Sequence, residues 1–356
     1  VEGSGWEHRS IAGEPQSKSM VWVIPDFHSQ SGGHINIVRM IALLRERGFE
    51  HQRVVVIEPH RWTDQDAAQA AFDSAFEING VSVSLGIETI GPCTYLFATS
   101  WQTAYAVKQY PYAVNKMYFV QDYEPYFYAH GSDYYFARET YEIGLVGVVA
   151  GDWLASKLAT DHGMRVSPYS FSYDRALYYR RERREPNVRR VLFYARPVTP
   201  RRCFEIGLLA LDEVVRRHPD IKVIFAGWDV STYKIPFTHF NAGTVRVTDL
   251  GDLYSQCDAA LVLSATNLSL LPMELAACGC PIVMNGEDDS NWLLDDQSVM
   301  YCRMEPLSIA DALSQVLTYP QAAAERAARA LAIANRSSWG EEADKVATFL
   351  NSLGCT

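Results

Sequence analysis

Three arginines follow a short apolar run in the second half of the chain. The run is Val191–Ala195, and the arginines are Arg196, Arg201 and Arg202. A guanidinium donates two parallel hydrogen bonds to a phosphate, so arginines at the end of a strand can hold a diphosphate without a metal ion. Surface arginines on a loop are the alternative interpretation, and their position at a strand end favours the phosphate site.

A second candidate site for an anion lies near the N-terminus, between the apolar run 20–25 and a helical pattern that starts near Ile35. Its sequence is Ser31–His34, with Gly32 and Gly33 at the centre. Paired glycines let the backbone approach a diphosphate or a sugar, and the first N–H groups of the helix would donate to that ligand. A simple turn explains the glycines equally well. The G-x-G-x-x-G pattern of nicotinamide sites is missing here.

Two carboxylates, Asp122 and Glu124, follow the apolar run Lys116–Gln121. A carboxylate at this position could orient the hydroxyl of an acceptor or stabilise positive charge on a reacting carbon. Capping of a neighbouring helix explains either residue equally well, so both interpretations stay open.

Metal-binding patterns are weak. Asp64 and Asp66 have the spacing of a D-x-D pair, but Thr63 and Asp66 are expected to cap the helical run 67–76, and no metal is expected there. Cys278 and Cys280 are two of seven cysteines with irregular spacing. Buried, reduced cysteines of a cytoplasmic protein explain them better than a metal or a disulfide.

The composition limits the choice of partners. The chain has 356 residues, 48% of them hydrophobic, and a formal net charge of −10. An acidic chain is poorly suited to bind nucleic acid, whose phosphates require a basic face. No apolar run is long enough for a transmembrane helix. The expected location is the cytoplasm, with peripheral contact to the inner face of the membrane left open.

The order of the elements predicts two Rossmann-like, doubly wound domains with an active site in the cleft between them. Apolar strands alternate with helical patterns twice, which is typical of parallel sheets covered on both faces. The predicted parts are an arm at 1–19, an acceptor domain at 20–180, a linker at 181–188, a donor domain at 189–336, and a helix at 337–356 that returns to the first domain. Ligands of such sheets bind at the carboxyl ends of the strands.

The segment Ser264–Val283 resembles the donor-site motif of the retaining glycosyltransferase family 4, which has the GT-B fold. The resemblance covers most of the chain: Gly32-Gly33, the basic pair Arg196 and Arg202, and Ser338-Trp339 also match. It implies that Glu274 bonds the ribose of the donor. It also implies that backbone amides of four loop residues hold the distal phosphate: Leu268, Ser269, Leu270 and Leu271. The residues before the next helix, Arg246 and Val247, would border the base.

One position departs from the family pattern. The first of two glutamates in the motif, which contacts the donor sugar in relatives, is replaced by Thr266. This loss suggests a donor sugar with fewer hydroxyl groups. Together with Gln121–Pro125, it resembles the branch that includes S-layer-glycan rhamnosyltransferases, which implies a donor such as dTDP-rhamnose.

The expected function is therefore hexosyl transfer from a nucleotide-diphosphate sugar to a glycan or lipid-linked glycan, with retention and without a metal or other cofactor. Two other classes stay open. A sugar-nucleotide epimerase also pairs Rossmann-like domains. A non-catalytic module that binds nucleotide sugars or glycans would explain the missing glutamate.

Overall fold

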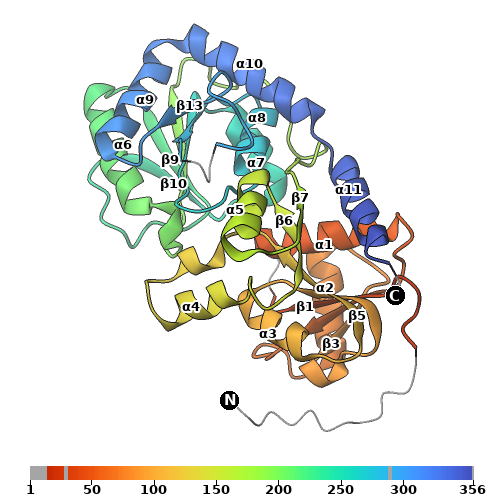
Figure 1. The fold of residues 1–356 in the computed structure, drawn as a ribbon. Helices are drawn as coiled ribbons and strands as arrows, with labels where there is room; N and C mark the ends of the chain where they lie inside the picture. Colours follow the sequence, from red (N-terminus) through yellow and green to blue (C-terminus); the bar gives the residue numbers. More distant parts are fainter. Residues whose placement is uncertain (1–13, 28–30, 288–290, 355–356) are drawn as a thin grey trace. The chain divides into compact units, whose positions relative to one another are not determined.

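The computed structural model describes residues 14–27, 31–287 and 291–354. The chain divides into two compact units, one made of the residues up to Tyr169 together with those from Gly340 onward, the other of Ser170–Trp339. Each unit contains one sheet with helices packed against it (Figure 1).

The first unit is built on a seven-stranded sheet in which all neighbouring strands are parallel. Its order is β3-β2-β1-β4-β5-β6-β7. The chain therefore winds outward from β1 to β3, returns to β4 beside β1, and winds outward again. The strands are β1 (Met20–Ile24), β2 (Gln52–Val56), β3 (Ser82–Leu85), β4 (Cys93–Ala98), β5 (Ala113–Val120), β6 (Val146–Ala150) and β7 (Val166–Tyr169).

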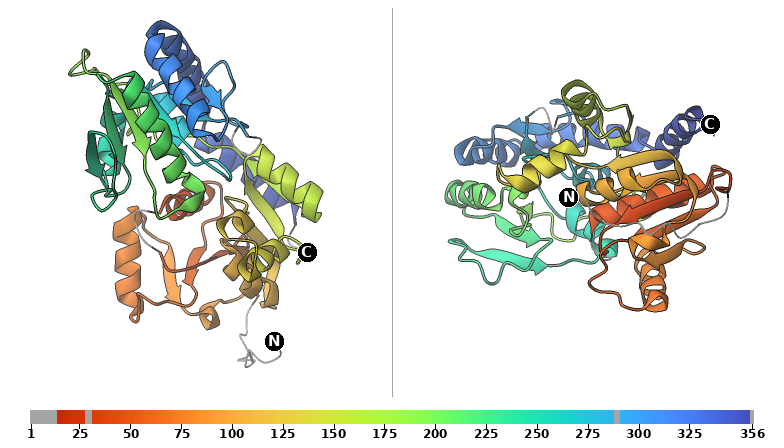
Figure 2. Two further views of the ribbon diagram at one scale, coloured as in Figure 1. Left: turned by 90° about the vertical axis from the view of Figure 1, so that its left-hand side faces the viewer. Right: turned by 60° about the horizontal axis from the view of Figure 1, so that its bottom comes forward.

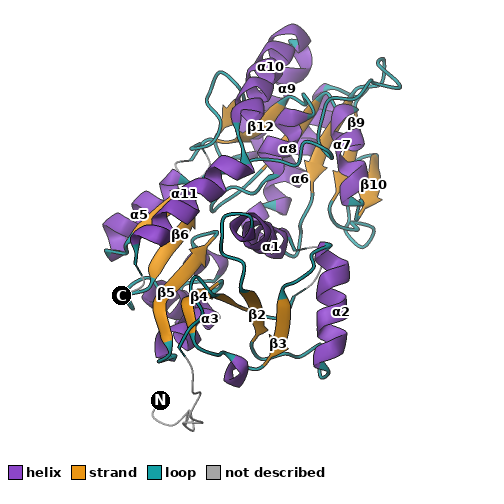
Figure 3. Cartoon of the chain, turned by 90° about the vertical axis from the view of Figure 1, so that its right-hand side faces the viewer, coloured by secondary structure: helices purple, strands orange, loops and turns teal. Residues whose placement is uncertain are grey.

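Helices connect these strands and cover the sheet (Figure 3). They are α1 (Gly32–Arg45), α2 (Gln65–Phe76), α3 (Trp101–Gln109), α4 (Ser132–Glu139) and α5 (Asp152–His162), with short 3-10 turns at Ile87–Thr89 and Glu124–Phe127. The last helix, α11 (Trp339–Ser352), joins this unit: the Tyr95 hydroxyl donates to the carbonyl of Leu350 at 2.8 Å, and Arg47 pairs with Asp344 at 2.7 Å.

The second unit repeats the architecture with a six-stranded parallel sheet of order β10-β9-β8-β11-β12-β13. Figure 2 shows the sheet from two further sides. Its strands are β8 (Arg190–Tyr194), β9 (Lys222–Ala226), β10 (His239–Gly243), β11 (Ala259–Val262), β12 (Ile282–Asn285) and β13 (Met300–Cys302). Its helices are α6 (Phe204–Arg217), α7 (Val247–Ser255), α8 (Leu271–Ala277), α9 (Pro306–Thr318) and α10 (Pro320–Arg336), after a 3-10 turn at Pro200–Arg202.

Close contact between α6 and β8 depends on a glycine. A Cβ placed on Gly207 would lie 2.5 Å from the ring of Phe193, so only glycine lets the helix lie on that ring. Phe193 and its neighbours Phe204 and Phe225 are buried in one apolar core with the inner residues of α9. This packing fixes the end of β8, where the first candidate arginine follows.

The predicted linker 181–188 is mostly exposed to solvent, but it also makes ordered contacts with the second unit. Arg183 donates two hydrogen bonds to Asp258, at 2.7 and 3.0 Å, and the Arg184 amide donates to Gln256 at 2.9 Å. Each of these contacts pairs the basic run with a polar group just after α7. The division between the units lies near residue 170, about ten residues before the predicted linker.

Candidate functional site

The candidate donor site lies at the point where the second sheet reverses its winding direction. The neighbours β8 and β11 are consecutive in space but separated in the chain by β9 and β10. Loops that leave two such strands diverge to opposite faces of the sheet and leave a crevice, where ligands of doubly wound sheets bind. The arginine segment follows β8, and the segment Ser264–Leu271 follows β11.

The structure joins these two loops. Arg202 donates from Nη1 to the hydroxyl of Ser264 at 2.6 Å, and the amide of Ala265 donates to the carbonyl of Arg201 at 2.8 Å. Both arginine side chains are half-buried. Cys203, directly after them, has a φ of +50°, a conformation that costs energy for a residue with a side chain. The backbone is thus held in an unusual turn where two arginines meet the next loop.

Arg196 lies at the end of β8 and is half-buried. Its Nη1 donates to the carbonyl of Gly227 at 3.2 Å, at the end of the neighbouring strand β9. Burial raises the pKa of the Tyr194 hydroxyl, and the positive charge of Arg196 opposes that rise. The guanidinium therefore stands beside Tyr194 at the carboxyl edge of the sheet.

Hydrogen bonds within the loop after β11 fix its conformation. They correct the predicted roles of Thr266 and of the Leu268 amide. The side chain of Thr266 is fully buried, so it does not stand where a sugar could contact it. The amide of Leu268 donates to the Asn267 side chain at 2.9 Å and is therefore not available to a phosphate. Asn267 also accepts from the indole of Trp292 at 2.9 Å. These contacts use groups that the sequence had assigned to the donor.

The next three residues keep their amides open. Within the described part of the chain, no group accepts a hydrogen bond from the amides of Ser269, Leu270 or Leu271. Ser269, Leu270 and Leu271 are half-buried. Open backbone N–H groups beside arginines are a suitable surface for an anion.

Glu274 lies in α8, half-buried in a group of tyrosines. Burial, the negative charge of Glu274 and a hydrogen bond to its carboxylate together raise the pKa of Tyr178. Burial is also the main reason that the pKa of Tyr254 lies well above its ordinary value, and Glu274 adds to it. The helix ends at Gly279, whose φ of +69° favours glycine and turns the chain into β12.

The predicted nucleoside residues of α7 lie on the surface. Arg246 keeps 81% of its side chain exposed and pairs with Asp249 in the same turn at 2.8 Å. Val247, the first residue of α7, is exposed as well. Their side chains are free to meet a ligand but are not part of the contacts around Glu274.

In the first unit, Gly32 and Gly33 form the first turn of α1 instead of a loop before it, with Ser31 as the capping residue. The side chain of Gln121, directly after β5, donates to the carbonyl of Gly33 at 3.3 Å and accepts from Asn36 at 3.1 Å. The glycine segment and the end of β5 therefore meet at the carboxyl edge of the first sheet.

The two acidic residues after β5 differ in their surroundings. Glu124 is buried; one carboxylate oxygen accepts from the amide of Trp101 at 2.9 Å and the other from the Tyr118 hydroxyl at 2.6 Å. These bonds cap α3 and favour a structural role. Asp122 is only half-buried and accepts from the amide of Tyr123 at 2.8 Å.

The D-x-D pair serves as a helix cap, with a shift of one residue from the prediction. Asp64, and not Thr63, caps α2, and its carboxylate accepts from the amide of Asp66 at 3.1 Å. Among residues 14–27, 31–287 and 291–354, no three His, Cys, Asp or Glu side chains are placed to share a metal ion. Both Cys278 and Cys280 are buried free thiols.

Sequence reasoning missed the end of β12. Asn285 exchanges two hydrogen bonds with the backbone of Ser264, at 2.9 and 2.8 Å, and donates to the Glu287 carboxylate at 2.5 Å. It therefore ties an exposed carboxylate to the serine that accepts from Arg202. The signal was present as Asn285-Gly286-Glu287, a polar group directly after an apolar strand.

The chain is similar to one family model and to one curated protein. Residues 189–314 match the family described as "WsaF, C-terminal domain". The O-antigen biosynthesis protein RfbC of Myxococcus xanthus is 30% identical over 346 residues, which is 95% of this chain and 27% of that protein. The chain thus spans about a quarter of the length of this relative.

Solved structures share the whole architecture. Alr3699/HepE of Anabaena in complex with UDP-glucose is similar with a TM-score of 0.70 and 14% identity, over 94% of this chain and 99% of that one. Sucrose-phosphate synthase of Thermosynechococcus elongatus is similar with a TM-score of 0.69 and 11% identity, over the same shares. These likenesses confirm the predicted fold: two Rossmann-like domains with parallel sheets, arranged in the chain as in GT-B glycosyltransferases.

Among the described helices, none combines the length and the apolar character needed to cross a lipid bilayer.

Proposed function

We propose that this chain is a glycosyltransferase that moves a hexose from a nucleotide-diphosphate sugar to a glycan acceptor. The observation that carries the proposal is the contact between Arg202 and Ser264 across the crevice of the second sheet. Together with Arg196, which follows the same strand β8, this contact gathers cationic side chains where doubly wound sheets bind ligands. The match to the WsaF domain covers this same region.

The relatives support the substrate class. One solved structure of similar fold holds UDP-glucose, and the partly covered relative is named for O-antigen biosynthesis. A nucleotide sugar and a growing glycan are therefore the proposed partners, with the glycan free or linked to a lipid. Both the nucleotide sugar and the glycan acceptor belong to the proposal.

The proposed handling of the diphosphate needs no metal ion. As the bond between the anomeric carbon and the phosphate oxygen breaks, negative charge grows on the diphosphate. Arg196, Arg202 and the open amides of Ser269 and Leu270 would neutralise it. One such donor in a preorganised site contributes about 2–4 kcal/mol of transition-state stabilisation.

We propose that the configuration at the anomeric carbon is retained. In front-face attack, the acceptor oxygen bonds to the anomeric carbon on the side from which the diphosphate leaves, and the acceptor proton passes to a leaving phosphate oxygen. Asp122 would orient the acceptor hydroxyl from the first unit. Glu124 is given no catalytic role, since both of its oxygens bond within its own unit.

We propose a deoxyhexose donor such as dTDP-rhamnose. The support is the position equivalent to the first motif glutamate, where Thr266 offers no carboxylate and is buried. A site without that carboxylate has one acceptor fewer for the hydroxyls of the sugar, so a sugar with fewer hydroxyl groups loses less on binding.

A panel of nucleotide sugars, each incubated with and without a rhamnose-terminated acceptor, tests the proposal. The glycosyltransferase releases nucleoside diphosphate quickly only when acceptor is present. Thermal shift with dTDP, UDP and GDP ranks the bases, because a ligand that binds only the folded chain raises its melting temperature.

The other two function classes are outcomes of the same experiment. An epimerase would change the donor without acceptor, and a binding module would show a thermal shift without turnover. Either result would overturn the proposed transfer reaction.

A further inference from the structure

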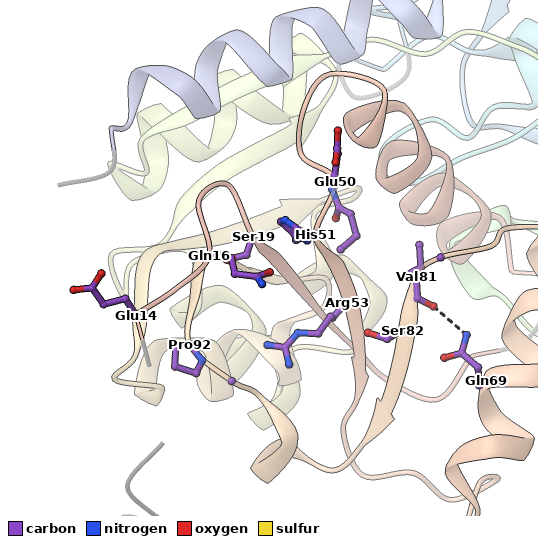
Figure 4. Close-up of a pocket in the computed structure, with 13 residues that line it drawn as sticks. Glu14, Gln16, Ser19, Glu50, His51, Arg53, Gln69, Val81, Ser82 and Pro92 are labelled. Atoms are coloured by element: carbon purple, nitrogen blue, oxygen red, sulfur yellow. Dashed lines mark hydrogen bonds between the residues drawn. The ribbon is translucent and has the colours of Figure 1, made fainter. Parts of the chain in front are cut away.

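A pocket lined mainly by polar residue types opens at the amino ends of the strands in the first unit, at the edge of the sheet opposite to the glycine segment and Gln121. It has a volume of about 770 Å³ and lies where β1, β2 and β3 begin. Figure 4 shows the side chains that line it. A volume of this size suits a small polar ligand.

Arg53, the second residue of β2, reaches into this pocket and is half-buried. In the part of the chain that the structure describes, its guanidinium has no hydrogen bond and no ion pair. The guanidinium lies against Gly91: a Cβ on that glycine would stand 3.1 Å from Nη2 and 3.3 Å from Nη1. The lack of a side chain at residue 91 thus gives the guanidinium its place.

Among the described residues that line the pocket, no carboxylate pairs with Arg53. Glu14 and Glu50 line its rim, but Figure 4 shows that their carboxylates point away from the guanidinium. On the inner side, the charge of Arg53 acts on Cys93 and Tyr110, and burial raises the pKa of both groups to about 12. Both are therefore neutral at pH 7. Partial burial of a guanidinium costs part of its hydration free energy. An anionic ligand bound to Arg53 would offset that cost.

Three further side chains around Arg53 carry groups that can form hydrogen bonds with a ligand. Gln16, His51 and Ser82 line the pocket, and within the described residues their side chains make no hydrogen bond. An amide, an imidazole and a hydroxyl are the groups that bind the hydroxyls of a sugar. The pocket therefore combines one fixed cation with several neutral donors and acceptors.

We propose that this pocket is a second, non-catalytic binding site for a small sugar that carries an oxyanion, either a phosphate or a carboxylate. The oxyanion would take bidentate hydrogen bonds from Arg53, the arrangement in which arginine binds both groups. Gln16, His51 and Ser82 would bind the hydroxyls of the sugar. The inference does not depend on the transfer reaction, because it uses the opposite edge of the sheet.

The test is a titration of the isotopically labelled chain, followed by nuclear magnetic resonance at the amides of Gly91 and Ser82. The probes are glucose 1-phosphate, glucuronate, inorganic phosphate and glucose. We expect both amides to shift with the anionic sugars, more weakly with inorganic phosphate, and not with glucose. A response to glucose 1-phosphate alone or to glucuronate alone identifies the anion.

Variants of the same chain make the result specific. Arg53→Gln should weaken binding of the anionic sugars by at least about 10-fold, the loss of one charge-assisted pair. The matched control is Arg138→Gln, which removes an exposed arginine of the same unit and should leave binding unchanged. Gly91→Ala, whose methyl group would displace the guanidinium, is a second test that keeps the arginine. Melting temperatures verify that each variant is folded.

The proposal is overturned if none of the anionic probes shifts Gly91 or Ser82 in the wild-type chain. It is equally overturned if folded Arg53→Gln or Gly91→Ala binds the anionic sugars as tightly as the wild type. Failure of sugar transfer would not affect it, because the titration measures binding at this pocket alone.

Discussion

Arg202 and Ser264, 62 residues apart, are joined by a hydrogen bond of 2.6 Å from the guanidinium to the hydroxyl. Ser264 is buried, and its single hydroxyl proton is shared between the carbonyls of Thr266 and Asn267, at 3.1 and 3.0 Å. One serine hydroxyl therefore fixes both the direction of a cation and the shape of the loop beside it.

Ser264→Ala should reduce transfer without unfolding the chain. The substitution removes the acceptor that orients Arg202, and loss of one hydrogen bond to a charged group should lower kcat/KM by about 10-fold or more. Steady-state kinetics with the preferred donor provide the measurement. Ser314→Ala is the matched control, since the buried hydroxyl of Ser314 has no partner among the described residues and its loss should be neutral. Equal kinetics for both variants would contradict a role of Ser264 in orienting Arg202.

Glu124→Gln and Asp122→Asn should separate stability from activity. Glu124 is buried with both oxygens bonded, so the amide should lower the free energy of unfolding by about 1–3 kcal/mol. Asp122 is half-buried and its carboxylate accepts from the adjacent amide of Tyr123, so its variant should lose less stability than Glu124→Gln but transfer more slowly. Urea unfolding and initial rates measure the two effects. The opposite pattern, with Asp122→Asn unstable and Glu124→Gln inactive but stable, would reverse the assignment.

The bidentate pair of Arg183 and Asp258 should stabilise the second unit. Only 28% and 25% of the two side chains are exposed, and Asp258 also accepts from the amide of Arg190 at 2.7 Å. Asp258→Asn leaves a half-buried arginine with a weaker partner, which should cost about 1–3 kcal/mol of unfolding free energy. The control Asp311→Asn removes one of the carboxylates that pair with Arg217, at a side chain that is 69% exposed, where a loss below about 1 kcal/mol is expected. Equal losses in urea unfolding would contradict a special stabilising role for this pair.

The buried thiols predict a fall of stability at alkaline pH. Burial raises the pKa of Cys93, Cys257 and Cys278 from 9.0 to about 12. Because the folded pKa is the higher one, the folded chain keeps these protons after the unfolded chain has lost them. The resulting stability is complete below pH 9 and decreases between pH 9 and 12, by about 1.4 kcal/mol per pH unit and thiol.

A thiol reagent tests this directly. In a Cys355→Ser variant at pH 8, Cys93, Cys257 and Cys278 should react with DTNB far more slowly in the native than in the urea-unfolded chain. Unfolding at pH 10 should require less urea than at pH 8. Fast native labelling of these cysteines, or a midpoint that does not change with pH, would contradict their burial as thiols.

The central strands could be predicted from sequence, whereas the edges of both sheets could not. Apolar runs such as Val21–Ile24 and Val191–Phe193 are buried on both faces, so their pattern predicts a strand directly. The edge strands β3, β7, β10 and β13 are short, and most of their residues are only half-buried. Nothing in their local sequence distinguishes them from loops, because the neighbouring strand, and not their composition, holds them.

The sequence points to candidate site residues but not to the internal bonds around them. The arginines stand out because they follow an apolar strand, and the glutamate of α8 stands out because its segment resembles the donor-site motif of family 4. That Leu268 gives its amide to Asn267, and that Thr266 is covered, depends on how a loop folds over itself, which spacing does not specify. The sequence does not mark Asn285 as a site residue, because an asparagine at a strand end resembles an ordinary turn residue.

The most direct test of the proposed function is a rate measurement of donor turnover with acceptor, made on wild-type chain and on Arg196→Ala, each with and without EDTA. We expect the wild type to keep its rate in EDTA, and Arg196→Ala to lose about 100-fold or more while melting at the wild-type temperature. Loss of wild-type turnover in EDTA, or full turnover by Arg196→Ala, would contradict a diphosphate held by arginines.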